Sequence, residues 1–364
     1  MKLSEIIIEQ IRKEGPISFH DFMENSLYHP TLGYYTSPKE HIGKNGDFYT
    51  SSSLTPAFGA MVARQVQQMW DISGETSFTI VEYGAGTGLL CRDILDYFKN
   101  YPELYSHLRY CIIEKSAVMR QRQKRHLTEK VSWYDSAESM GKITGCILSN
   151  ELLDNFSVHQ VIMEDELMEI FIDYTTEFVE IKRPASDRIK EYLEELKVEL
   201  PMGFRTEINL EAIDWLREIS QFLEKGYVIT IDYGALSAEL YSPRKNCGTI
   251  VCYRNHTINE LPYNDIGNQD ITAHVNFSAL AHWGSKFGLG FCGYTNQACF
   301  LLALGFKEYL RKTLPEEENI LSMIKKESFI THQLLVDMGS KFKVLIQRKG
   351  IADHALLGLS LSLA

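Results

Sequence analysis

The sequence predicts an α/β fold built on a wound parallel sheet. From residue 77 to residue 234, short runs of β-branched and apolar residues alternate with segments of helical periodicity, which is typical of a parallel sheet with helices on both faces. Several of these runs end in glycine or an acidic residue, at the strand ends where wound sheets bind ligands. The 364 residues are 45% hydrophobic and 23% charged, as in an ordinary globular protein.

Composition excludes several classes of function. The chain has 37 Lys and Arg against 48 Asp and Glu, a formal charge of −11, which argues against binding to nucleic acid because that needs a basic face. Seven cysteines without a CxxC pair indicate free thiols in a reducing compartment and no structural zinc or other metal. No apolar run approaches the ~20 residues of a membrane span, and the N-terminus lacks a signal-peptide pattern. We therefore expect a cytoplasmic protein without membrane contact, and a homo-oligomer stays open.

The N-terminal part predicts one helix, a lid and a second helix. Leu3, Ile6, Ile7 and Ile11 have the spacing of one helical face. The following stretch, dense in turn formers and tyrosines over residues 28–49, predicts an ordered lid over a pocket, because loops of this length are usually functional or disordered. Thr55 and Pro56 then supply the start signal of a helix over residues 57–70.

The remaining elements follow in order. Five strands are predicted at residues 77–84, 108–116, 130–136, 145–151 and 226–234, with helices over 89–100 and 117–127. Two insertions interrupt the sheet: antiparallel strands over 159–182 with helices over 189–200 and 211–225, and a loop-rich segment over 235–276. Helices over 277–288 and 296–305 and a strand over 341–349 close the core.

These elements divide the chain into seven parts. They are an N-terminal helical and lid segment (1–75), the first part of a ligand-binding core (76–160), an insertion of strands and helices (161–225), a core strand (226–234), a substrate-side insertion (235–290), the end of the core (291–350) and a tail (351–364).

The first predicted strand runs into the motif Glu82-Tyr83-Gly84-Ala85-Gly86-Thr87-Gly88. Glycines at alternate positions permit a tight turn and let a ligand approach the backbone closely. The pattern lacks the third-glycine spacing of a dinucleotide site, which disfavours an NAD-dependent dehydrogenase. The acidic Glu82 suits a cationic ligand without phosphate, and S-adenosylmethionine, with its sulfonium and amino acid, fits. A merely structural turn is the alternative.

Acidic residues end the next two predicted strands. Glu114 occupies the position that accepts hydrogen bonds from ribose hydroxyls in wound folds; a solvated strand-end acid is the alternative. Asp135 could approach the adenine, as could Ser136 or a backbone group. Both acids extend the candidate cofactor site beyond Gly88.

The fourth strand ends in Asn150-Glu151-Leu152-Leu153-Asp154-Asn155. Two carboxylates facing a methyl donor can bind a guanidinium bidentately and favour its reacting nitrogen, although a helix-capping cluster would look similar. His159 is a candidate base or a structural histidine. Asp232 and Tyr233 end the fifth strand, either at the ligand edge or in an ordinary turn.

Nine sequence blocks, in order, resemble the MidA family of class I S-adenosylmethionine-dependent methyltransferases. They are YHPTLGYY, GDFYTS followed by FG, EYGAGTG, IIEKS, NELLDN followed by HQ, DYG, GTIVCYRNH, DITAHVNF and TNQACFLL. The resemblance implies a Rossmann-like class I methyltransferase sheet with an N-terminal lid and with insertions between and after strands four and five. It also implies methylation of arginine in a protein substrate.

The resemblance also implies roles for individual residues. Glu82, Gly84, Gly86 and Glu114 would bind the methyl donor, and Asp47, Thr50 and Ser51 would close over the same site. Asn150, Glu151 and Asp154 would face donor and substrate, and Asp270, Thr272 and His274 would belong to the substrate side. Two alternatives stay open: a binding or assembly factor with a methyltransferase fold, and a methyltransferase for a small molecule or another residue type.

Overall fold

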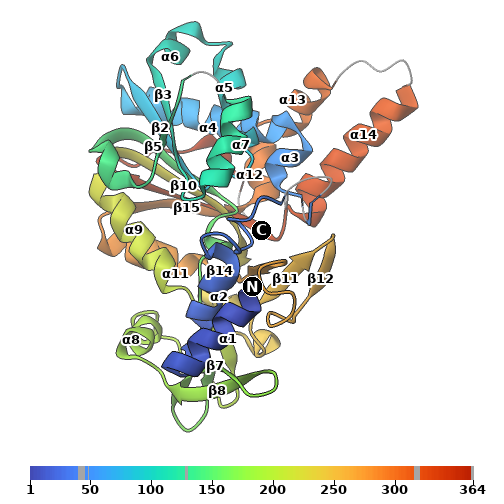
Figure 1. Cartoon of the computed structure of the whole chain (residues 1–364). Helices are drawn as coiled ribbons and strands as arrows, with labels where there is room; N and C mark the ends of the chain where they lie inside the picture. The colour runs from blue at the N-terminus through green and yellow to red at the C-terminus, as the bar shows by residue number, and fades with distance from the viewer. Residues whose placement is uncertain (40–45, 48, 128–129, 315–319, 362–364) are drawn as a thin grey trace. The chain divides into compact units, whose positions relative to one another are not determined.

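The computed structural model describes residues 1–39, 46–47, 49–127, 130–314 and 320–361, and its elements are labelled in Figure 1. The chain forms two compact units. Unit 1 contains residues 1–48, 153–216 and 234–283, and unit 2 contains residues 49–152, 217–233 and 284–364. The predicted lid over 28–49 falls in part on residues 40–45 and 48, which lie outside the described residues.

Unit 2 contains the wound sheet, with strand order β15-β16-β10-β5-β2-β3-β4. The strands β10, β5, β2, β3 and β4 are parallel, as predicted. The strand β16 is antiparallel to both its neighbours, so the sheet is mixed; the sequence predicts this last strand but not its direction. The bounds are β2 (Phe78–Tyr83), β3 (Leu108–Ile113), β4 (Val131–Tyr134), β5 (Ile143–Asn150), β10 (Leu223–Ala235), β15 (Gly290–Asn296) and β16 (Phe342–Lys349).

Helix α4 (Pro56–Ser73) begins where the sequence predicts it. The Thr55 side chain accepts a hydrogen bond from the Ala57 backbone N–H, and Pro56 occupies the first turn, where no N–H donor is needed. The stacked rings of Trp70 and Phe78, with centroids 5.4 Å apart, join this helix to β2. The apolar core of unit 2 thus lies between α4, α5 (Leu89–Phe98) and the sheet.

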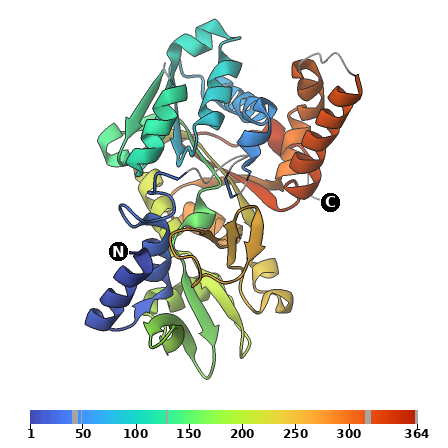
Figure 2. The ribbon, with the colours of Figure 1, turned by 45° about the vertical axis from the view of Figure 1, so that its right-hand side comes forward.

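The other helices of unit 2 include a pair near the C-terminus that was not predicted. Helices α13 (Phe306–Thr313) and α14 (Ile320–His332) pack side by side (Figure 2). The tail, which the sequence left unplaced, docks within unit 2, where the Gly358 N–H donates to Gln65 Oε1 of α4 at 2.7 Å. The remaining helices are α3 (Ser51–Leu54), α5 (Leu89–Phe98), α6 (Pro102–His107), α7 (Ala117–His126) and α12 (Gln297–Ala303).

Unit 1 is built on an antiparallel sheet of order β1-β7-β6-β9, with β8 paired to β7. The strands β6 (His159–Met163), β7 (Leu167–Tyr174) and β8 (Phe178–Pro184) confirm the predicted antiparallel insertion. Helix α1 (Leu3–Glu14) buries Leu3, Ile7 and Ile11. The shorter strands are β1 (Ile17–Ser18) and β9 (Arg205–Ile208).

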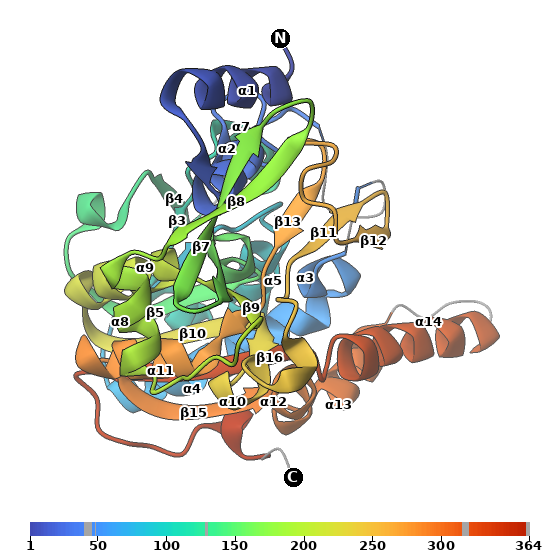
Figure 3. The same cartoon turned by 90° about the horizontal axis from the view of Figure 1, so that it is seen from below.

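Two parts of unit 1 differ from the sequence prediction. Helix α2 (Phe19–Tyr28) was missed next to the Gly15-Pro16 turn, although Ser18 caps it by accepting from the Asp21 N–H. The segment predicted to be loop-rich contains a small sheet (Figure 3) of β11 (Val251–Arg254), β12 (Thr257–Asn259) and β13 (Asp270–Thr272). The other elements are α8 (Asp187–Glu195), α10 (Ser237–Leu240) and β14 (Val275–Asn276).

Two helices and one strand have residues in both units. Helix α9 (Leu210–Phe222) ends three residues earlier than predicted, because β10 already begins at Leu223. Helix α11 (Phe277–Lys286) was predicted nearly to its bounds. No helix of the described residues is both long enough and apolar enough to cross a membrane.

Candidate active site

The glycine motif forms a tight turn between β2 and α5. The φ angles of Gly84, Gly86 and Gly88 are 63°, 50° and 82°, a left-handed region that other residues adopt only with strain. A Cβ atom on Gly84 would lie 2.7 Å from Leu152 Cδ1. The turn therefore requires Gly84 both for its backbone angle and for the close approach of Leu152.

Glu82 lies at the end of β2, directly before this turn. It is 2% exposed, and the Tyr110 hydroxyl donates to its Oε2 at 2.8 Å. Burial raises the pKa of Glu82 to about 7, against the smaller opposing effect of the Tyr110 hydrogen bond. A carboxyl with this pKa changes its charge near neutral pH, so a bound cation would favour its ionised form.

Glu114 follows β3 and is connected to the glycine turn through Gln123 of α7. Gln123 is fully buried, and its Nε2 donates to the Gly86 carbonyl at 2.9 Å and to Glu114 Oε2 at 3.2 Å. Its Oε1 accepts from Trp133 Nε1 at 2.9 Å. Sequence reasoning missed Gln123, since a neutral residue within a basic helix gives no signal. Burial raises the pKa of Glu114.

The end of β5 places Asn150 and Glu151 at the same edge of the sheet. Glu151 has a φ of 53°, unusual for a residue with a side chain, and its Oε1 accepts from the Ser51 N–H at 2.9 Å and from Asn150 Nδ2 at 3.1 Å. Asn150 Oδ1 is buried and has no hydrogen-bond partner among the described residues. A buried acceptor without a partner is costly, which makes this atom a candidate ligand contact.

The end of β10 supports the same edge. Asp232 is fully buried, and its Oδ2 accepts from the Leu152 N–H at 3.1 Å. Tyr233 packs edge-on against Phe342, with ring centroids 5.6 Å apart. Asp232 thus holds the backbone that carries Glu151 and Leu152.

Two other predicted donor contacts lie at the margin of this region. Asp135, after β4, is 81% exposed in its side chain and forms an ion pair with Arg120. Thr50 precedes α3, and its N–H donates to Ser53 Oγ at 3.1 Å, which caps that short helix. Their contact with a donor stays a prediction.

In unit 1, Asp154 and Asp270 lie in one buried cluster with two tyrosines. Asp270 accepts from the Tyr35 hydroxyl at 2.9 Å and from Asn155 Nδ2 at 3.0 Å. Burial and the charge of Asp154 raise the pKa of Asp270 well above its usual range. The Tyr28 hydroxyl donates to the Asn155 carbonyl, and its ring stacks on Tyr35 at 5.7 Å. The structure thus gathers acids and rings that are distant in sequence.

Asp47, predicted to close over the donor, makes its recorded contacts within unit 1. Its Oδ2 accepts from the Tyr34 hydroxyl at 2.7 Å, and its Oδ1 accepts from the Asn255 N–H at 2.6 Å. Its carbonyl accepts from the His256 N–H at 3.0 Å. Asp47 therefore fixes the turn between β11 and β12, at which Asn255 and His256 have positive φ.

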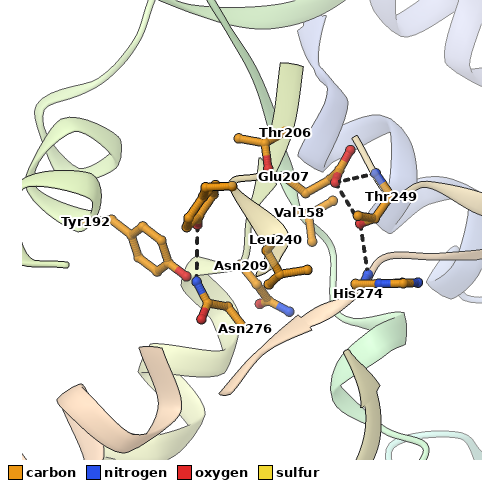
Figure 4. A pocket seen from close by; sticks show the side chains of 10 residues that line it. Val158, Tyr192, Thr206, Glu207, Asn209, Leu240, Thr249, His274 and Asn276 are labelled. Atoms are coloured by element: carbon orange, nitrogen blue, oxygen red, sulfur yellow. Dashed lines mark hydrogen bonds between the residues drawn. The ribbon is translucent and has the colours of Figure 1, made fainter. Parts of the chain in front are cut away.

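Three further predicted residues occupy different places in unit 1. His159 Nδ1 lies 2.6 Å from Glu169 Oε1, and its ring stacks on His20 at 4.7 Å. Thr272 Oγ1 donates to the Val251 carbonyl. His274 lines a small polar pocket in unit 1 (Figure 4), in which its N–H donates to Thr249 Oγ1 at 3.0 Å.

The pocket of Figure 4 has room on the order of one water molecule. The half-buried Glu207 accepts there from the N–H and the Oγ1 of Thr249, both at 2.8 Å. These bonds satisfy Glu207, so the pocket is a structural feature of unit 1. The described residues contain no cluster of histidine, cysteine and acidic groups arranged to hold a metal ion.

Comparison with known proteins decides the class of this site. Residues 61–295 match the model of a family described as S-adenosyl-L-methionine-dependent methyltransferase, Methyltransf_28. The chain belongs to this methyltransferase family. The match confirms the class predicted from the glycine motif and the strand-end acids.

Relatives and solved structures agree with this assignment. The methyltransferase is 26% identical to the mitochondrial protein arginine methyltransferase NDUFAF7 of Bos taurus, over 93% of this chain and 81% of the relative. The Drosophila melanogaster homologue is 25% identical, over 96% and 85%. A COG1565 superfamily member from Burkholderia thailandensis, solved with S-adenosyl-homocysteine, is 30% identical with a TM-score of 0.89, over 99% and 95%.

The residues at the sheet edge fit S-adenosylmethionine, which supplies an electrophilic methyl group on a sulfonium. The glycine turn leaves the backbone open to a ligand, and Glu114 offers carboxylate oxygens suited to ribose hydroxyls. Asn150 Oδ1 offers an acceptor that no described residue uses. This set contains several acids and no cation placed to bind a phosphate group. It therefore suits S-adenosylmethionine, which has no phosphate.

Proposed function

We propose that this methyltransferase methylates an arginine side chain of a protein substrate. The relatives named above as protein arginine methyltransferases support this, as do the carboxylates Glu151 and Asp154 near the end of β5. The observation that carries the proposal is the buried cluster around Asp154 and Asp270. Two carboxylates and the stacked rings of Tyr28 and Tyr35 form surroundings suited to a planar cation.

The reaction is an in-line displacement, for which positioning is the main requirement. Attack by a guanidinium nitrogen breaks the C–S bond, forms an N–C bond and releases one proton from the guanidinium. Carboxylates near that group disperse its charge and localise electron density on one nitrogen. We assign this function to Glu151 and Asp154.

The test is mass spectrometry of a lysate incubated with the protein and isotope-labelled donor. We expect labelled methylarginine in a protein with the wild type, and at least tenfold less with Glu151→Gln or Asp154→Asn. Glu103→Gln, on the exposed helix α6, is the matched acid-to-amide control and retains full activity.

Three other outcomes would each contradict part of the proposal. Label in a small molecule or another residue type would overturn the arginine assignment. Binding of donor without any labelled product would favour an assembly factor. Wild-type rates for both Glu151→Gln and Asp154→Asn would refute the assignment of these residues only.

A further inference from the structure

The segment from Lys115 to Lys130 has a charge opposite to that of the chain. It contains six lysines and arginines and a single acidic residue, Glu129, within a protein of net charge −11. Most of it forms helix α7, whose 10 residues extend over roughly 15 Å. This local reversal of charge is not required by the methyl-transfer site.

The two faces of α7 differ in their exposure to solvent. Met119 and Gln123 are buried, while Lys124 and Arg125 are exposed to solvent and Arg122 is half-buried beside them. About one turn of the helix therefore presents three cations on the side away from the core. We call this surface, defined by Arg122, Lys124 and Arg125, the α7 basic face.

Two other cations of the segment, Arg120 and Lys130, are already engaged. Arg120 pairs with Asp135, and Lys130 Nζ donates to the Tyr105 and Ser106 carbonyls at 2.7 Å and 2.9 Å. By contrast, no ion pair with a carboxylate is recorded for Lys124 or Arg125 within the described residues; Lys124 Nζ lies 5.2 Å from the Trp133 ring centroid. Among the residues that the structure describes, these two charges therefore have no carboxylate partner.

We propose that the α7 basic face docks an acidic segment of a partner protein. Cations grouped within one helical turn complement carboxylates at similar spacing on a helix or an extended peptide. A phosphate backbone would need a wider basic surface, whereas Asp135 and Glu138 follow directly in sequence and the chain has a pI of about 5.5. The proposal does not depend on which group accepts the methyl.

The same helix connects this face to the donor site. Gln123 on the buried side donates to the Gly86 carbonyl and to Glu114, and Leu127 Cδ1 lies within 3.0 Å of where a Cβ on Gly88 would sit. A partner that shifts or restrains α7 therefore changes donor affinity, and by linkage the donor changes partner affinity by the same factor.

The experiment measures binding of a fluorescent octaglutamate peptide by anisotropy at 50 mM salt (a low ionic strength, at which screening is weak). The double variant Lys124→Gln/Arg125→Gln should bind at least fivefold more weakly than wild type. Lys325→Gln/Lys326→Gln, an exposed adjacent pair on α14, changes the net charge equally and should bind as wild type. Saturating peptide should change the S-adenosyl-homocysteine Kd at least twofold in wild type and not in the Lys124/Arg125 variant.

Several results would overturn the proposal. Equal loss in both double variants would show a non-specific charge effect. Tighter binding of a 12-mer of oligothymidylate than of octaglutamate would assign the face to nucleic acid. Self-association that sedimentation detects in wild type but not in the Lys124/Arg125 variant would make a second copy the occupant. An unchanged S-adenosyl-homocysteine Kd would refute the coupling.

Discussion

The Glu151 carboxylate accepts a hydrogen bond from the Ser51 N–H at 2.9 Å, joining the end of β5 to the first residue of α3 across 100 residues of sequence. Glu151 makes this contact from a backbone with a φ of 53°. A non-glycine residue in this region has a conformational cost of about 1 kcal/mol. The protein therefore retains a strained backbone at the residue that we assign to the guanidinium.

Comparison of two truncations tests this strain. We expect Glu151→Gly to be about 1 kcal/mol more stable than Glu151→Ala, because both lose the Ser51 contact but only glycine relaxes the backbone. Urea unfolding measures the difference, and both variants should have lost methyl transfer. Equal stabilities, or a more stable alanine variant, would contradict the strain.

The glycine turn gives a second prediction. Gly84→Ala should weaken S-adenosyl-homocysteine binding at least tenfold in calorimetry, since the new Cβ would meet Leu152 Cδ1 at 2.7 Å and the φ of 63° disfavours alanine. Adding Leu152→Ala removes the clash but keeps the backbone angle, so it should restore only part of the affinity. Complete restoration would show that φ is unimportant.

The pKa of Glu82 predicts how stability depends on pH. The pKa of Glu82 in the folded protein, about 7, lies above the ordinary 4.5. Its contribution to the free energy of unfolding is therefore complete below pH 4.5 and is lost as pH rises through 7. For this pKa shift the loss of stability is about 3 kcal/mol, and Glu82→Gln should remove it because glutamine does not ionise. Unfolding of the ligand-free protein at pH 5 and pH 8 should show a smaller difference in the variant. An unchanged difference would refute the raised pKa.

Substitutions of two tyrosines of unit 1, Tyr35 and Tyr28, form a matched pair that tests the buried acid cluster. Tyr35→Phe removes a hydrogen bond to the Asp270 carboxyl, and Tyr28→Phe removes one to the neutral Asn155 carbonyl. Because burial favours the neutral, protonated form of Asp270, both bonds join neutral groups, and we expect each substitution to destabilise the protein by about 1 kcal/mol. Thermal or urea unfolding measures both, and a loss with Tyr35→Phe about twice that with Tyr28→Phe would contradict a neutral Asp270.

A substitution of Asp47 distinguishes a structural role of this residue from a contact with the methyl donor. Its carboxylate bonds Tyr34 and the Asn255 N–H, so Asp47→Ala should destabilise the protein by about 2 kcal/mol. We expect the Kd of S-adenosyl-homocysteine to change less than twofold. A tenfold weaker Kd without loss of stability would instead support the donor contact that the family resemblance implies.

Features set by neighbouring residues could be predicted from the sequence. The glycine turn after β2 and the acids after β5 were found because strand, turn and acid follow one another within a few residues. Helix α4 was found because Thr55 and Pro56 mark its start locally. In each case the signal and the structure occupy the same short stretch.

Features that depend on distant residues could not be predicted. The strand β15 contains Gly290 and Gly293, which disfavour a strand, and its pairing with β16 stabilises it as one. The segment of β11–β13 has a loop-like composition, and its sheet depends on Asp47 and on pairing within the insertion. Asp270 and Asp154 come close to each other only in the folded protein, since over a hundred residues of sequence separate them.

The place of β10 in the chain has a consequence for biosynthesis. The strand lies in the middle of the sheet between β5 and β16, yet it begins only at Leu223, after the whole second segment of unit 1. A nascent polypeptide that already contains β2–β5 therefore has an open apolar edge at β5 until the later residues leave the ribosome. Such an edge is prone to aggregation, and its late pairing makes folding slow. Expression of this protein should accordingly depend on chaperones that shield nascent strands.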